Sequence, residues 1–218
     1  MRSALNRRIN KDSWYEMEST LLYDYMVRMT GKMDEMASSL VEVITAIRDQ
    51  EKEEDSEKTL QEVRVNLYLT AKRFCADSWG KYPDAALDQV YHGTNQHDVL
   101  RKVEDFLKDQ SVDVREFLLL KDRYKFSDED IREILSPNNG AFEKQVEASY
   151  KSFDETFPDL ERKAFIQLPL FSIENNYEIT AALSAVLELP KSKMKRRLVS
   201  LAWVLAIVTL IYLGLRFS

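Results

Sequence analysis

The chain has 218 residues, of which 44% are apolar and 31% charged, with only 5 Gly and 5 Pro. This composition excludes a collagen-like chain and disfavours disorder and turn-rich all-β architectures, so we predict an all-α fold. The net charge is −6; the first eleven residues carry four cations and residues 191–218 carry six, all without an acid, which leaves −16 for residues 12–190. Such an acidic body disfavours binding of nucleic acid.

The first predicted unit, residues 1–53, combines a basic arm with one long amphipathic helix. The helix is expected to begin near residue 12 and to end in the charged run at 49–58, with Gly31 weakening its middle. Its apolar residues recur at alternating steps of four and three, which is a heptad seam. The seam consists of Leu22, Met26, Met29, Met33, Met36, Leu40, Val43 and Ile47. Packing in the core of a bundle is favoured over a methionine-rich surface for a partner, and self-association through the seam stays open.

The second predicted unit, residues 54–190, is an acidic helical domain that packs with the long helix. Helices are expected at 57–79, 84–92, 96–109, 113–124, 128–135, 141–157 and 173–189. Ser127, with Asp130 three residues later, predicts a capping box at the start of the 128–135 helix. Residues 159–169 fit no single pattern, and Pro190 is expected to separate the domain from the basic stem that follows.

Sites for catalysis, cofactors or metal are not expected. His92 and His97 are five residues apart with Gly93 between them, so they would not share a helix face as metal ligands. Cys75 stands between Phe74 and Ala76 without a run of cations, which indicates a small buried side chain rather than a nucleophile. Each of the five glycines is isolated, so no phosphate-binding loop is present in the sequence. We therefore predict a protein that is not an enzyme.

Two fragments resemble motifs of the Bcl-2 family of apoptosis regulators, which are tail-anchored helical proteins. Ser78-Trp79-Gly80-Lys81 resembles the Asn-Trp-Gly-Arg motif of that family, and residues 139–143, Asn-Gly-Ala-Phe-Glu, are similar to its Asn-Gly-Gly-Trp-Asp motif. The resemblance covers nine residues. In that family a strongly apolar central helix follows the first motif, whereas here Tyr82-Pro83-Asp84 and a polar segment follow. The resemblance implies a cell-death regulator or a protein that perturbs membranes.

The third predicted unit, residues 191–218, is a basic stem followed by a transmembrane tail anchor. The 18 residues from Leu198 to Leu215 carry no charge, and as a helix they would span about 27 Å, which suffices for a thin bilayer. Trp203 and Tyr212 suit the two interfaces, and Ile207 lies near the middle. The stem carries Lys191, Lys193, Lys195, Arg196 and Arg197, which would fix topology and contact lipid headgroups. By the positive-inside tendency the N-terminal domain would be cytoplasmic and the protein single-pass.

Together these features predict a tail-anchored membrane protein whose acidic domain binds protein partners as an adaptor, a tether or an accessory subunit of a membrane complex. The partners are the lipid bilayer and one or more unidentified proteins, with a homo-oligomer possible and no nucleic acid. The alternative is the membrane-perturbing or cell-death regulator that the Bcl-2 resemblance implies.

Overall fold

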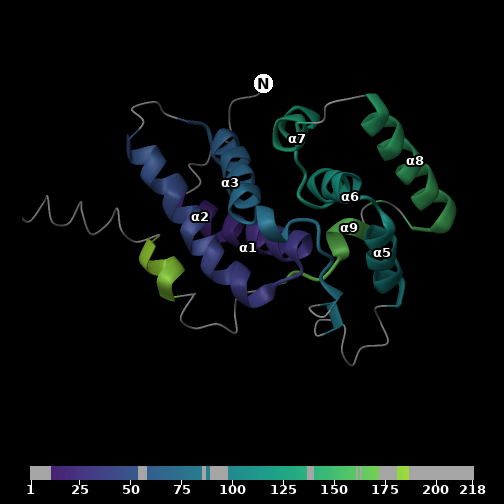
Figure 1. Ribbon diagram of the computed structural model, residues 1–218, viewed down its shortest axis with the longest axis horizontal. Helices are drawn as coiled ribbons and strands as arrows, with labels where there is room; N and C mark the ends of the chain where they lie inside the picture. Colours follow the sequence, from purple (N-terminus) through teal and green to yellow (C-terminus); the bar gives the residue numbers. More distant parts are fainter. Residues whose placement is uncertain are drawn as a thin grey trace, which may run out of the picture.

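The computed structural model describes residues 11–53, 58–84, 87–88, 98–136, 140–160, 162, 164–171 and 181–186. Every regular element in these residues is helical, which confirms the predicted all-α class. The elements are α1 (Lys11–Thr30), α2 (Met33–Glu53), α3 (Leu60–Phe74), the 3₁₀ turn η1 (Ala76–Ser78), α5 (Asp98–Asp109), α6 (Val112–Leu118), the π-helical turn η3 (Leu119–Arg123), α7 (Asp128–Leu135), α8 (Gly140–Thr156) and α9 (Ala164–Gln167). Figure 1 shows α1, α2 and α3 gathered on one side of the molecule and α5, α6, α7 and α8 on the other.

The single long N-terminal helix predicted from the heptad seam is wrong. The chain instead forms two helices, α1 and α2, that fold back on each other at Gly31. The hydroxyl of Tyr15, near the start of α1, donates to Glu51 Oε2 at the end of α2 over 2.7 Å, so the two helices run in opposite directions. Gly31 has a φ of +71° and its N–H donates to the Val27 carbonyl, a geometry that ends a helix and that glycine adopts at little cost.

The heptad seam lies inside the domain. Leu22, Met26, Met29, Met36, Leu40, Val43 and Ile47 are at most 4% exposed, and Met33 beside the turn is partly buried and packs against the core. Residues 22–30 of α1 are buried on every side, whereas α2 alternates between buried and exposed positions, and the heptad spacing of apolar residues fits both helices. These side chains are therefore core residues of this domain, and they do not form an open groove.

The helix α3 begins with a capping box and covers the α1–α2 pair. The Thr59 hydroxyl accepts from the Glu62 N–H, and the Glu62 carboxylate accepts from the Thr59 N–H in return. After α3 and η1 the chain returns to the end of α1, where the Gly80 N–H donates to the Met29 carbonyl over 2.7 Å. This contact satisfies a carbonyl that the last turn of α1 leaves without a helical partner.

The helices predicted over 96–109, 128–135 and 141–157 agree closely with α5, α7 and α8, whereas most of the helix predicted over 84–92 lies outside the described residues. The predicted bounds of α7 are those observed, and its capping box of Ser127 and Asp130 is confirmed. The helix expected over 113–124 is α6 followed by the π-helical turn η3, and the ambiguous stretch 159–169 contains the short helix α9. Of the final helix expected over 173–189, residues 181–186 are described; they are helical, and Leu183 and Val186 pack against the core.

A buried ionic network ties the chain segment after α8 to the first helix. The carboxylate of Asp24 in α1 is fully buried and accepts from Arg28 Nε, Arg123 Nε and the Tyr124 hydroxyl. Arg28 Nη1 also donates to both carboxylate oxygens of Glu104 in α5, with both distances 2.8 Å. The two arginines donate further hydrogen bonds to backbone carbonyls of 165–169, and the Phe171 N–H donates to Asp24. Two cations thus balance two anions inside the domain.

A second buried carboxylate fixes α6 against α1 and α3. Glu116 accepts from the Tyr25 hydroxyl, from Lys72 Nζ and from Trp79 Nε1 at distances of 2.7 to 3.2 Å. The next residue, Phe117, points to the other side of α6, where it takes part in the groove described below. The buried hydrogen bonds of Glu116 therefore also fix the position of Phe117 on α6.

Candidate functional site

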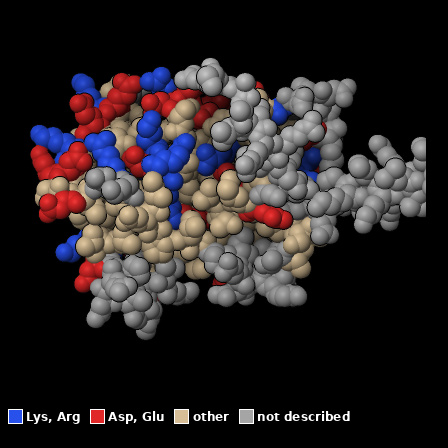
Figure 2. Space-filling view, turned by 180° about the vertical axis from the view of Figure 1, so that it is seen from behind, with Lys and Arg blue, Asp and Glu red and all other residues tan. Residues whose placement is uncertain are grey.

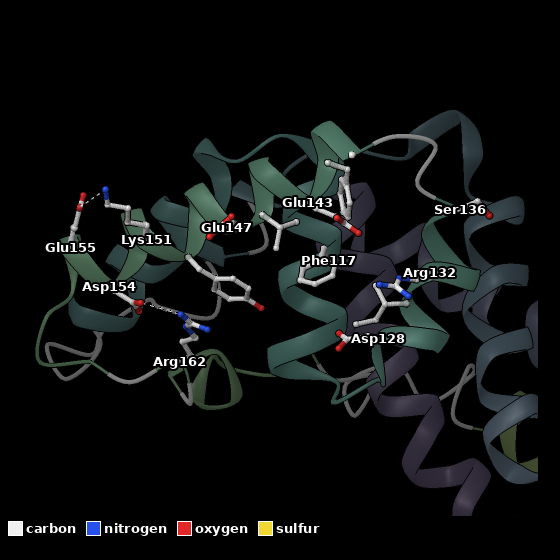
Figure 3. A pocket seen from close by; sticks show the side chains of 15 residues that line it. Phe117, Asp128, Arg132, Ser136, Glu143, Glu147, Lys151, Asp154, Glu155 and Arg162 are labelled. Carbon is white, nitrogen blue, oxygen red and sulfur yellow. Dashed lines mark hydrogen bonds and ion pairs between the residues drawn. The ribbon is translucent and has the colours of Figure 1, made fainter.

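A groove of about 1110 Å³ opens between α6, α7 and α8 and ends at Arg162 (Figure 3). Its volume lies just above the range of about 300 to 1,000 Å³ that is typical of small-molecule pockets. Its floor is made of apolar side chains from three helices: Phe117, Ile131, Phe142, Val146 and Tyr150. Charged side chains surround this floor, so the groove has an apolar bottom and a polar rim.

The aromatic residues of the floor form one continuous surface. Phe117 of α6 lies edge-on between two rings of α8, with its centroid 5.7 Å from that of Phe142 and 6.4 Å from that of Tyr150. All three rings remain partly exposed. Because Phe142, Val146 and Tyr150 recur every four residues, the apolar track follows α8 for about 12 Å. The floor is elongated and parallel to a helix.

The far end of α8 is anchored in the core, which holds the groove open. Phe153 is fully buried and contacts the rings of Phe106, Phe157 and Phe165 at centroid distances of 4.9 to 5.3 Å. One turn earlier, the Tyr150 hydroxyl donates to Asp122 Oδ2 over 2.7 Å. Burial raises the pKa of Asp122, although its bond with Tyr150 and the nearby cations act in the opposite direction.

Arg162 closes one end of the groove. Its guanidinium lies 4.0 Å from the centre of the Tyr150 ring and donates to Asp154 Oδ2 over 3.0 Å. The hydrogen bond to Asp154 raises the pKa of Arg162. Since Tyr150 and Asp154 both belong to α8, this arginine stays over the end of the apolar track.

The rim is richer in acids than in bases, and only some of its charged side chains form ion pairs. Lys151 contacts Glu155 at 3.8 Å, Arg162 contacts Asp154, and Asp128 contacts Lys121 outside the groove at 2.7 Å. Three rim residues make no ion pair with any described residue: Glu143 and Glu147 on α8, and Arg132 on α7. The rim therefore offers two carboxylates one turn apart on one wall and a guanidinium on another.

Neither a described cluster of metal ligands nor the cysteine contributes to the lining of the groove. Among the residues that the structure describes, no group of three or more His, Cys, Asp or Glu side chains could hold a metal ion. The one cysteine, Cys75, is buried away from the groove, 3.5 Å from the Met36 sulfur, and burial raises its pKa to about 11. A thiol with that pKa is protonated at neutral pH and is a poor nucleophile.

The sequence pattern did not predict the groove, and none of the predicted site residues is among the residues that line it. The seam residues are in the core, while the stem and the anchor at 191–218 lie outside the described residues. Within the described part of the chain, no helix combines the length and the apolar character needed to cross a bilayer.

On the side opposite to that of Figure 1, positive and negative side chains lie next to each other (Figure 2).

Comparison of the chain with models of known protein families, with curated proteins and with solved structures finds no match to any of them. The resemblance to the Bcl-2 family thus stays a prediction from nine residues. Within the first of the two fragments, Trp79 donates to buried Glu116, and Gly80 has a φ of +92° and caps α1. Both residues have evident structural roles here, and residue 139 of the second fragment lies outside the described residues.

Proposed function

We propose that this chain is a tail-anchored adaptor whose acidic helical domain binds a partner protein in the groove between α6, α7 and α8. The observation that carries the proposal is the groove itself: an apolar floor along α8 whose three aromatic rings stay partly exposed, with charged side chains around it. An apolar track with polar walls suits an α-helix of another protein, which would lay its own apolar face on the floor.

The membrane part of the proposal rests on the uncharged segment from Leu198 to Leu215 and on the five cations before it. Such a segment would hold the domain at a membrane surface, with the groove facing the cytoplasm. A protein fixed in this way meets partners at the same membrane at raised effective concentration, so a weak groove could suffice for recognition.

Replacing both Leu205 and Val208 by Arg should release the chain from membranes into the alkaline-carbonate supernatant. Each charge at the centre of a bilayer costs about 2.5 to 3.5 kcal/mol, so two of them outweigh the gain from inserting this short segment. The measurement is the distribution of the full chain between pellet and supernatant.

The control replaces the five stem cations by Gln and should leave the chain in the pellet. The stem contributes about 1 kcal/mol per cation at an anionic surface, whereas the apolar segment provides the attachment. Release of this stem variant would contradict the tail anchor, because it would mean that the segment only lies on the surface and is held there by charge.

Photo-cross-linking tests the groove as a protein-binding site. A photoreactive phenylalanine analogue at Phe142, on the floor, should give a discrete protein adduct in the native cell. The same analogue at Phe74, which is 50% exposed at the end of α3 and does not line the groove, is the matched control and should give none. The adduct at 142 should disappear when Phe117 is replaced by Ala, since this removes the central ring of the floor.

The outcomes are distinct. A 142 adduct that depends on Phe117 and is absent at 74 supports a partner helix in the groove. Equal labelling at 142 and 74, or no protein adduct at either position, would overturn the groove as a protein-binding site. An adduct with a second copy of this chain would identify the partner as the protein itself.

A further inference from the structure

We infer that the ligand of the groove is a basic amphipathic helix, which carries two cations one turn apart on one flank of its apolar face and a carboxylate on the other flank. This inference rests on the proposed function and names the chemistry of the partner. It follows from three features of the groove: the length of the floor, the two carboxylates of α8 that make no ion pair with a described residue, and the guanidinium of α7.

The floor fits apolar side chains at helical spacing. Phe142, Val146 and Tyr150 stand one turn apart along α8, and Phe117 lies between the two rings. A ligand helix that lies along this track would place apolar residues at positions i, i+4 and i+7 over it, a length of about 10 Å. A compact small molecule would use one part of the floor, whereas a helix uses its full length.

The α8 wall selects positive charge. Glu143 and Glu147 are both exposed, both line the groove, and neither makes an ion pair with a described residue (Figure 3). Like charges four residues apart on a helix repel each other, so a cation of the ligand placed between Glu143 and Glu147 would be favoured. The other carboxylates of the rim, Asp154, Glu155 and Asp128, already have cationic partners.

The α7 wall favours a negative charge on the ligand, and this fixes the direction in which the ligand helix lies. Arg132 is exposed on α7, lines the groove and makes no ion pair with a described residue. A ligand helix with cations towards α8 would meet this guanidinium with its other flank, where an acid fits. The two walls thus distinguish the two directions in which a helix could lie, because the reversed helix would place its cations beside Arg132.

Designed peptides test this charge pattern on the full chain in zwitterionic nanodiscs, with empty nanodiscs as the blank. The first probe is a fluorescein-labelled helical peptide of about 18 residues with leucines along one face, two arginines one turn apart on one flank and a glutamate on the other. The second probe has glutamates in place of the two arginines and an arginine in place of the glutamate. We expect fluorescence anisotropy to show that the first peptide binds about tenfold more tightly than the second.

The variant E143K/E147K should invert this preference, so that it binds the second peptide more tightly than the first. The matched control is D105K/D109K, which makes the same charge change at the same spacing on exposed positions of α5 outside the groove, and it should keep the parental preference. Circular dichroism should show that both variants melt like the parent, because all four side chains are exposed. If E143K/E147K does not fold, the comparison of the two peptides on the parent chain still decides the question.

Equal binding of the two peptides by the parent, or a parental preference in E143K/E147K, would overturn the inference. These results differ from failure of the proposed function, which is the loss of the protein adduct at position 142. If a partner cross-links at 142 but the peptides show no charge preference, the groove binds protein and only the stated chemistry of the partner is wrong.

Discussion

Replacing Asp24 by Asn should lower the free energy of unfolding of the domain by about 3 to 5 kcal/mol, because the charges of Arg28 and Arg123 would lose the buried anion between them. A domain of this size has a stability of about 5 to 15 kcal/mol, so the loss is a large part of the total. The measurement is urea unfolding of the full chain in a mild detergent, followed by far-ultraviolet circular dichroism.

The matched control is Asp105→Asn, which removes the same charge from an exposed position on α5 and should change the stability by less than about 0.5 kcal/mol. Equal stability of the Asp24 variant and this control would mean that the buried network contributes nothing net to folding.

Acid should affect the parent and the Asp24 variant differently. Burial alone would raise the pKa of Asp24, but the charges of Arg28 and Arg123 and the hydrogen bonds from Arg123 and Tyr124 outweigh it and lower the pKa in the folded protein. The stabilisation is therefore complete above the pKa of an unfolded aspartate, about 3.9, and is lost as the pH falls towards the lower folded value. The variant should lack this part of the acid sensitivity.

Replacing Gly31 by Ala should destabilise the domain by about 2 kcal/mol, because the turn between α1 and α2 cannot accept a side chain. An alanine at a φ of +71° is strained, and its Cβ would lie 2.8 Å from the Tyr82 carbonyl oxygen, which is backbone and cannot turn away. The measurement is the shift of the urea midpoint at constant slope.

Gly140→Ala provides the comparison for this glycine. Gly140 begins α8, and a Cβ there would meet nothing within 4 Å, so the stability should stay within about 0.5 kcal/mol of the parent. A similar loss at both positions would show that general effects of glycine on the unfolded chain, rather than the turn, set the cost.

The sequence predicts the local structure of this domain better than its long-range arrangement. The bounds of α7 and its capping box follow from residues that are neighbours in the chain, and so does the extent of α8 to within a residue. Thr59 and Glu62 carry the same kind of signal for the start of α3 at Leu60, whereas the apolar pattern predicts a start near residue 57. The turn at Gly31 was hidden because a heptad seam has the same spacing in one long helix and in two helices that share a core.

The buried charges could not be predicted, since in the sequence they look like ordinary surface residues. Asp24 pairs locally with Arg28, but the pairs Arg28–Glu104 and Arg123–Asp24 join residues that are 76 and 99 positions apart in the chain. The groove is hidden for a similar reason. The pattern of α8 predicts one apolar face, but the structure divides it: Phe153 faces the core, while Phe142 and Tyr150 line the groove with Phe117 of α6.

The attachment of residues 164–171 to the first helix determines when the domain can be completed during synthesis. Arg28 of α1 needs the Pro169 carbonyl, 141 residues later, and Asp24 accepts from the Phe171 N–H, 147 residues later. Contacts of such long sequence separation form late in folding, because the chain between them must first be ordered. Before residues 164–171 have been synthesised, α1 and α2 can pair, but Arg28 and Arg123 still lack the backbone carbonyls of 165–169 as acceptors. Residues 164–171 are thus made late, and they complete the hydrogen bonds of the buried charges.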